Sequence, residues 1–176
     1  VMGAVDLMAA LLQREHTGLG RHLDFSQIEA CNMYVGDAMV GWSSAGFDPE
    51  RRGNDHENYV LQGIFPCAHE GWIGVSCKDH LHLQLLSKYF DDRSLLEESM
   101  SKTDLALIVS EHTRSRDKMP LMHDLQEAGV PAGAVLDGPE LLENKHLLAR
   151  SAYIAQDRPG LGIKHYPNQP YRFRNS

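Results

Sequence analysis

A stretch at the start of the chain, Val1 to Ala30, constrains the fold more than any other segment. Before Glu15, apolar residues recur at steps of three and four, which predicts an amphipathic helix. Gly18 and Gly20 follow it and can take the positive φ angles of a helix end and a tight turn. We therefore expect the first helix to stop at this glycine pair.

The chain then restarts with an alternating pattern over residues 21–25, which is typical of a short strand. Ser26 and Glu29 have the spacing of a capping box, and apolar residues from Ile28 to Met39 give the following helix a broad apolar side. Helix, glycine turn, strand and helix form a connected unit. Units of this kind are common and by themselves identify no chemistry.

The composition is that of a globular protein. The chain has 176 residues, 42% hydrophobic and 23% charged, so it can bury one core or two small ones. Seventeen basic against twenty-four acidic residues give a net charge of −7, which argues against a nucleic-acid partner. No apolar run approaches the roughly 20 residues that span a bilayer, and no export signal precedes the first helix. We expect a cytoplasmic protein with no membrane partner.

Cysteine and histidine spacing gives no indication of a metal site. The three cysteines, Cys31, Cys67 and Cys77, are odd in number and lack CxxC spacing, so we expect reduced, mostly buried thiols. His80 and His82 lie two residues apart on a predicted helix and point about 200° apart, which is unsuited to holding one ion.

The rest of the chain predicts a mixture of helices and short strands. Residues 64–67 and 72–76 read as a β-hairpin whose turn is residues 68–71. Further helices are expected through Phe90 with Leu81, Leu85, Leu86 and Tyr89 on one side, and over residues 95–100, 103–114, 117–128 and 140–149. Final strands are expected at residues 153–155 and 171–173, with Gly160, Gly162 and Pro167 in the loop between them.

Four stretches together resemble one known family. They are Leu11-Leu12-x-Arg14-Glu15-x-Thr17-Gly18-x-Gly20, Asp24-x-Ser26-Gln27-x-Glu29-Ala30, the hairpin segment from Gly63 to Val75, and Leu125-x-x-Ala128-Gly129-Val130-Pro131-x-Gly133. They are similar to class III CoA-transferases, the family of formyl-CoA transferase, carnitine CoA-transferase and α-methylacyl-CoA racemase. Ala134 stands where the family usually has proline.

The resemblance implies an α/β fold whose small domain has helices around a small antiparallel sheet. Residues 1–45 would come from a Rossmann-like large domain and a linker, residues 46–137 would form the small domain, and residues 138–176 would return toward the large domain. Members of the family are interlocked, ring-like dimers, so the resemblance also implies a homodimer.

The same resemblance implies a transferase that moves CoA between carboxylic acids. Its partners would be an acyl-CoA and an acid, with CoA thioester as substrate and no separate cofactor. Family members use an aspartate that forms an aspartyl-CoA thioester. Ungapped alignment places that aspartate upstream of Val1, and Asp6 lies inside a helix at the wrong offset. We therefore expect an incomplete chain that is inactive alone.

One polar loop is the candidate site. Two guanidiniums could pair with CoA phosphates, a glycine lets backbone approach a thioester, and neighbouring donors could bind its carbonyl oxygen. The residues are Arg51 and Arg52 for CoA binding, and Gly53, Asn54, Asp55 and His56 for the active-site loop. In the family, a glycine-containing loop near this position covers the active site. The alternative is a solvated loop that links a helix to the hairpin.

Two other functions stay open at this point. One is a non-catalytic module that keeps the fold and uses it to bind CoA or to dimerise. The other is the racemase branch, whose members carry a catalytic glutamate where this chain has Ser76-Cys77-Lys78-Asp79. The missing glutamate disfavours racemase chemistry.

Overall fold

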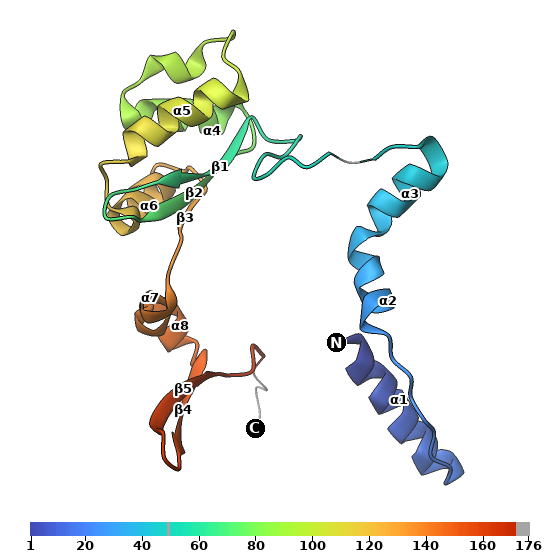
Figure 1. Ribbon diagram of the computed structural model, residues 1–176. Coiled ribbons are helices and arrows are strands. Elements are labelled where there is room, and N and C mark those ends of the chain that lie inside the picture. Colours follow the sequence, from blue (N-terminus) through green and yellow to red (C-terminus); the bar gives the residue numbers. More distant parts are fainter. Residues whose placement is uncertain (49, 172–176) are drawn as a thin grey trace. The chain divides into compact units, whose positions relative to one another are not determined.

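The computed structural model describes residues 1–48 and 50–171 and divides into two units, Val1–Arg51 and Arg52–Ser176. Figure 1 shows the first unit in blue to cyan and the second from green to red. Helices and small antiparallel sheets make up the fold, which confirms the predicted α/β class. The assignment of residues 1–45, 46–137 and 138–176 to family domains stays a prediction.

The first unit is built from helices. They are α1 (Met2–Thr17), α2 (Gln27–Asn32), a 3-10 turn (Met33–Val35) and α3 (Gly36–Ala45). The predicted first helix is confirmed, and it ends at Gly18, whose φ is +73° and whose N–H donates to the Arg14 carbonyl at 2.8 Å. Gly20 has no positive φ.

Two expectations for this unit were wrong. Residues 21–25 form no strand, because no neighbouring strand among the described residues supplies partners for their backbone groups. The second helix is interrupted at residues 33–35, where the chain tightens into a 3-10 turn. Ser26 does cap α2, since its Oγ accepts from the Glu29 N–H at 3.3 Å.

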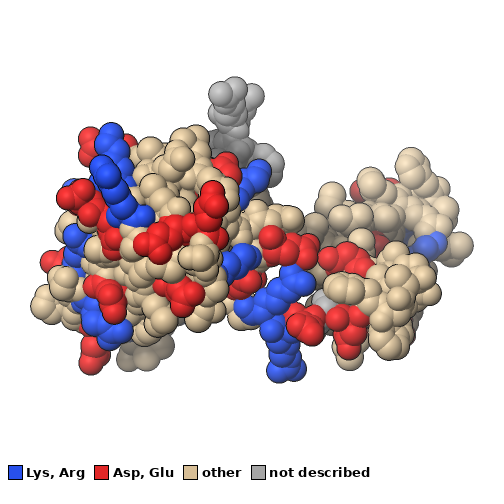
Figure 2. Space-filling view, turned by 90° about the horizontal axis from the view of Figure 1, so that it is seen from above, with Lys and Arg blue, Asp and Glu red and all other residues tan. Residues whose placement is uncertain are grey.

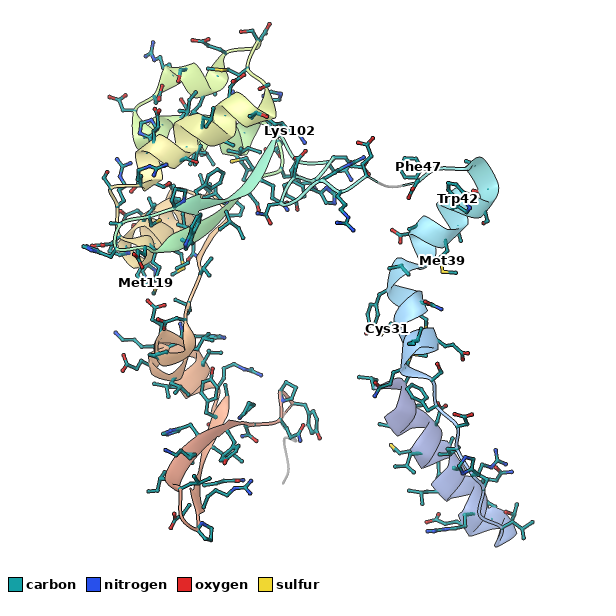
Figure 3. The ribbon with its side chains drawn as sticks, viewed as in Figure 1. Cys31, Met39, Trp42, Phe47, Lys102 and Met119 are labelled. Atoms are coloured by element: carbon teal, nitrogen blue, oxygen red, sulfur yellow. The ribbon has the colours of Figure 1, made fainter. Side chains whose placement is uncertain are left out.

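The first unit leaves its apolar side chains exposed. None of its described residues is buried, and the half-buried ones are glycines and alanines. On α3, Met39 is 54% exposed and Trp42 is 62% exposed; Figure 3 marks both. Its helices therefore present amphipathic faces without covering them.

The second unit contains a three-stranded antiparallel sheet in the order β1-β2-β3. Its strands are β1 (Leu61–Pro66), β2 (Trp72–Cys77) and β3 (Ala132–Ala134). Phe65 pairs with Ile73 in the hairpin, and Ile73 pairs with Ala134 on the other side of β2. The predicted hairpin is confirmed.

The hairpin turn carries two left-handed residues that are not glycine. His69 has φ +54° and Glu70 has φ +58°, and the Cys67 N–H donates to the Gly71 carbonyl at 2.7 Å. A left-handed conformation costs a residue with a side chain about 1–2 kcal/mol. The turn is therefore held by the ladder of β1 and β2 rather than by its own preference.

Helices pack against the sheet to form the core. They are α4 (His80–Phe90), α5 (Lys102–Thr113) and α6 (Lys118–Glu127), with a 3-10 turn at Arg93–Leu96. The buried apolar residues are Leu61, Phe65, Cys67, Ile73, Val75, Cys77, Leu83, Leu86, Phe90, Leu95, Leu105, Val109, Leu121, Leu125 and Val130. Within α4 the predicted face was partly wrong, because Leu86 is buried but Leu81 is 61% exposed.

The cysteines follow the predicted pattern in part. Cys67 and Cys77 are buried and Cys31 is exposed, and all three are free thiols. Burial raises the pKa of the Cys77 thiol to about 12, which keeps it protonated.

The end of the described chain has two short helices followed by a second, two-stranded sheet. Its elements are α7 (Gly138–Glu143), α8 (Lys145–Ala149), β4 (Tyr153–Arg158) and β5 (Gly162–Pro167), with β4 and β5 antiparallel. The predicted helix over residues 140–149 breaks at Asn144, whose side chain caps α8. Gly162 and Pro167 bound β5 instead of lying in a loop, Tyr171 is in no strand, and residues 172–173 lie outside the described residues.

Charge is mixed over the surface. Figure 2 shows basic and acidic side chains intermingled on the visible face rather than sorted by sign. Among the described residues, no helix has both the length and the apolar character to cross a membrane.

The core of the second unit can be tested in α4. We expect Leu86→Ala, at a side chain with no exposed surface, to lower the free energy of unfolding by about 2–5 kcal/mol, because it removes buried surface and leaves a cavity. The matched control, Leu81→Ala on the exposed side of the same helix, should change it by less than about 0.5 kcal/mol. Urea unfolding followed by Trp72 fluorescence in a Trp42→Phe background measures both; equal effects would contradict the assigned core.

Candidate functional site

The candidate site is the loop that precedes β1 in the second unit. We call residues 53–56 the Gly53–His56 loop. Lys102, the first residue of α5, donates from Nζ to the Asp55 Oδ1 at 2.8 Å and to the His56 carbonyl at 2.9 Å. Gln62, in β1, donates from Nε2 to the Asn54 carbonyl at 3.2 Å. Figure 3 marks Lys102 at the end of α5 near this loop. Two secondary-structure elements thus hold a segment that is itself irregular.

An ion pair lies beside the loop. The Arg52 guanidinium contacts the Glu57 carboxylate, with 2.9 Å between Nη1 and Oε2. This hydrogen bond is the main reason that the pKa of Glu57 lies below its usual value of 4.5. Both side chains are exposed, so the pair is weak and an anionic ligand could compete for the guanidinium.

The Asp55 carboxylate is also neutralised. Its hydrogen bond from Lys102 is the main cause that holds its pKa below the usual 3.8, and the charges of Lys102 and Arg52 add to the effect. Each of the two carboxylates in this short segment therefore has a cation beside it. Without those cations an incoming phosphate would meet two unscreened negative charges.

Gly53 provides open space at the edge of the loop. Its φ is +60°, which favours glycine, and apart from its two chain neighbours no described residue has a heavy atom within 4 Å of the place where a Cβ would stand. A ligand could therefore approach the backbone closely here.

The His56 ring has a defined orientation. Its Nδ1 accepts from the Asn58 N–H at 3.2 Å, and its plane meets the Tyr59 ring edge-on with 5.2 Å between centroids. With Nδ1 accepting, the neutral ring carries its proton on Nε2. That N–H is the kind of donor predicted for a carbonyl oxygen.

The structure brings together only part of the predicted site. Lys102 contacts Asp55 and His56, and the Asp55 N–H donates to the Arg52 carbonyl. Exposed Arg51 is the last residue of the first unit. Lys102 and Gln62 were not among the residues predicted for the site. A signal for Lys102 was present, because it follows Ser101, which forms a capping box with Asp104 and so begins α5.

One of the two histidines at the start of α4, His82, has a structural role. Asp79 caps the helix by accepting from the His82 N–H at 3.1 Å, and its Oδ1 lies 2.7 Å from the His82 Nδ1. Over residues 1–48 and 50–171, no three histidine, cysteine or acidic side chains are grouped so that they could hold a metal ion.

Comparison with known proteins identifies the family. The sequence profile of CoA-transferase family III matches residues 1–176. The chain belongs to CoA-transferase family III. This confirms the resemblance drawn from the four sequence stretches.

Individual CoA-transferases are similar over less than half of their length. The succinyl-CoA:mesaconate CoA-transferase of Haloarcula marismortui is 25% identical over 167 residues, which are 91% of this chain and 42% of that protein. The acetyl-CoA:oxalate CoA-transferase of Acetobacter aceti is 28% identical, covering 84% of this chain and 40% of that one. The chain thus spans about two fifths of these relatives.

A solved structure shares the fold. The CAIB/BAIF family protein from Brucella suis superposes with a TM-score of 0.80 at 21% identity, covering 98% of this chain and 46% of that one. At this identity the likeness concerns the fold alone.

The ion pair beside the loop makes a prediction about titration. The pKa of Glu57 is lowered in the folded state, so the contact with Arg52 is fully formed above pH 4.5 and is lost as the pH falls through the lowered value. Carboxyl-carbon NMR should place the Glu57 midpoint below 4.5, and Arg52→Gln should raise it toward 4.5. The control Arg114→Gln, an exposed arginine at the end of α5, should leave it unchanged. If the Glu57 midpoint is the same in Arg52→Gln as in the wild type, the pair does not persist in solution.

Proposed function

We propose that this chain contributes the Gly53–His56 loop to an enzyme that transfers CoA between two carboxylic acids. The observation that carries the proposal is the family match over residues 1–176. The loop supports it, because it presents an open glycine, an oriented imidazole and one neutralised carboxylate, and Glu57 directly after it is also paired with a cation.

The proposed reaction uses a carboxylate of the enzyme as nucleophile. A carboxylate oxygen attacks the thioester carbonyl carbon, the carbon–sulfur bond breaks, and CoA leaves as the thiolate. The thiolate then attacks the enzyme's acyl carbon in the mixed anhydride, which releases the donor acid and forms an enzyme-CoA thioester. The acceptor carboxylate repeats these two steps in the opposite direction, so that CoA ends on the acceptor and the enzyme carboxylate is restored.

We place the attacking carboxylate in a part of the protein that the relatives have and these 176 residues do not span. Asp55 is a poor candidate, because its charge is partly neutralised by Lys102. Glu57 is engaged by Arg52 in the same way. The chain on its own is therefore expected to bind CoA without exchanging it.

The loop has a defined part in this scheme. The His56 Nε2–H, together with backbone near Gly53, would donate to the thioester oxygen as negative charge develops on it. Arg52 would bind a phosphate of CoA. The substrates are a CoA thioester and an acid, as in the names of the relatives from Haloarcula marismortui and Acetobacter aceti.

CoA titration tests Arg52. We expect Arg52→Gln to weaken CoA binding by about tenfold, because it removes a charge-assisted hydrogen bond to phosphate. Isothermal titration calorimetry of the 176-residue chain measures the dissociation constants. The control Arg114→Gln should bind CoA as the wild type does.

Two outcomes would contradict the proposal. No heat of CoA binding to the wild-type chain would remove the assigned role of the loop. Turnover of succinyl-CoA with mesaconate, or of acetyl-CoA with oxalate, by the chain alone would show that the nucleophile lies within these residues. Racemase chemistry would appear instead as exchange of an α-proton with deuterated solvent.

We also propose that the chain forms a homodimer. The exposed apolar faces of α1 and α3 support this, because a second copy would remove them from water. Sedimentation equilibrium should give twice the chain's mass, and Met39→Lys should weaken the association, since it places a charge on an apolar face. Gln13→Lys, which adds the same charge at an exposed polar position of α1, is the control; a monomeric wild type at tens of micromolar contradicts the proposal.

A further inference from the structure

We propose that Lys102 is a positioning residue that holds the Gly53–His56 loop in its ligand-binding conformation. The inference rests on the proposed function, because it takes this loop to be part of the CoA site. It adds a residue far from the loop in sequence and assigns its ammonium group a defined task.

Lys102 makes two hydrogen bonds with the loop. Its Nζ donates both to the side chain of Asp55 and to the backbone carbonyl of His56, at 2.8 and 2.9 Å. A contact with one flexible carboxylate would leave the backbone free to move. A second contact, with the carbonyl of the next residue, fixes the backbone itself.

Lys102 lies on α5, a helix that is fixed by its N-terminal cap and by the core. Lys102 is the first residue of α5, which begins with the capping box of Ser101 and Asp104. The same helix is anchored in the core by Leu105 and Val109, both buried. The ammonium group is therefore attached to a well-packed helix, and its hydrogen bonds restrict the motion of a loop that has no regular structure.

The hydrogen bonds from Lys102 and Gln62 to the loop involve residues 54–56 and not Gly53. Lys102 binds Asp55 and His56, and Gln62 binds the Asn54 carbonyl, whereas Gly53 has open space beside it. The contacts thus hold residues 54–56 and leave the space beside Gly53 open. A loop ordered before the ligand arrives loses less conformational entropy on binding.

Lys102 also neutralises the charge of Asp55 in the loop. With Lys102 in place, Asp55 has its own cation, and the Arg52 guanidinium contacts the exposed Glu57. Without Lys102, the Asp55 carboxylate would compete with phosphate for the neighbouring guanidinium. Lys102 would therefore affect CoA binding both through position and through charge, and an experiment must separate the two.

Hydrogen–deuterium exchange of the 176-residue chain measures position without any ligand. The Asp55 N–H donates to the Arg52 carbonyl at 3.0 Å, and the Tyr59 N–H donates to the His56 carbonyl at 3.2 Å, so both amides report on the loop. We expect Lys102→Met to speed their exchange by about tenfold, and Lys102→Arg to stay within about threefold of the wild type, because arginine keeps the charge and two donors. Lys145→Met, at the exposed first residue of α8, is the matched control and should change nothing in this loop.

A double variant separates charge from position. Lys102→Met combined with Asp55→Asn restores the charge balance but removes the hydrogen bond to the His56 carbonyl. We expect CoA binding by this variant to stay weaker than in the wild type by about fivefold or more. Full recovery of affinity would mean that Lys102 acts through charge alone, and would overturn the inference.

The exchange result and the binding result fail independently. If Lys102→Met leaves loop exchange within about twofold of the wild type, the contact is only a surface ion pair and the inference is wrong, even if CoA binds. If exchange rises as expected but the wild type binds no CoA, Lys102 still orders the loop and the proposed function is what fails. Unchanged thermal unfolding of Lys102→Met would confirm that the exchange effect is local.

Discussion

The fold of the second unit depends on the burial of β2 between two neighbours. Strand β2 pairs with β1 and β3 and carries Ile73, Val75 and Cys77 into the core. Helices α4, α5 and α6 supply the opposing apolar side chains. Thr113, at the end of α5, donates to the Pro66 carbonyl at 2.7 Å and satisfies a backbone group where the β1 ladder ends. The sheet thus fixes α5, and α5 in turn fixes Lys102, so the order of an irregular loop derives from the core.

The two units differ in how their apolar residues are used. The second unit has a core, whereas none of the described residues of the first is buried. Amphipathic helices gain most of their stability from packing, so α1 and α3 would be marginal as isolated segments in water. Their sequence is that of elements that pack against other protein surface, which agrees with a chain that spans about two fifths of its relatives.

Local signals in the sequence predicted local structure well. Gly18 ends α1 and Ser26 caps α2, as their conformational preferences indicate. The errors occurred where structure depends on distant partners. Residues 21–25 alternate like a strand but have none beside them in the described chain, and β5 was missed because Gly162 and Pro167 read as loop residues although pairing with β4 overrides them. The loop was found through family resemblance, but Lys102 lies 47 residues from Asp55, a separation that no local pattern spans.

The burial of two cysteines has a consequence for oxidative chemistry. Oxidants and alkylating reagents attack the thiolate, and burial keeps Cys67 and Cys77 both protonated and out of reach. Cys31 is the accessible sulfur of the three, on a helix of the first unit that has no buried residue. Among the three thiols, Cys31 would therefore react first with peroxide, while the two cysteines of the core would stay unmodified for as long as the sheet that supports α5 remains folded.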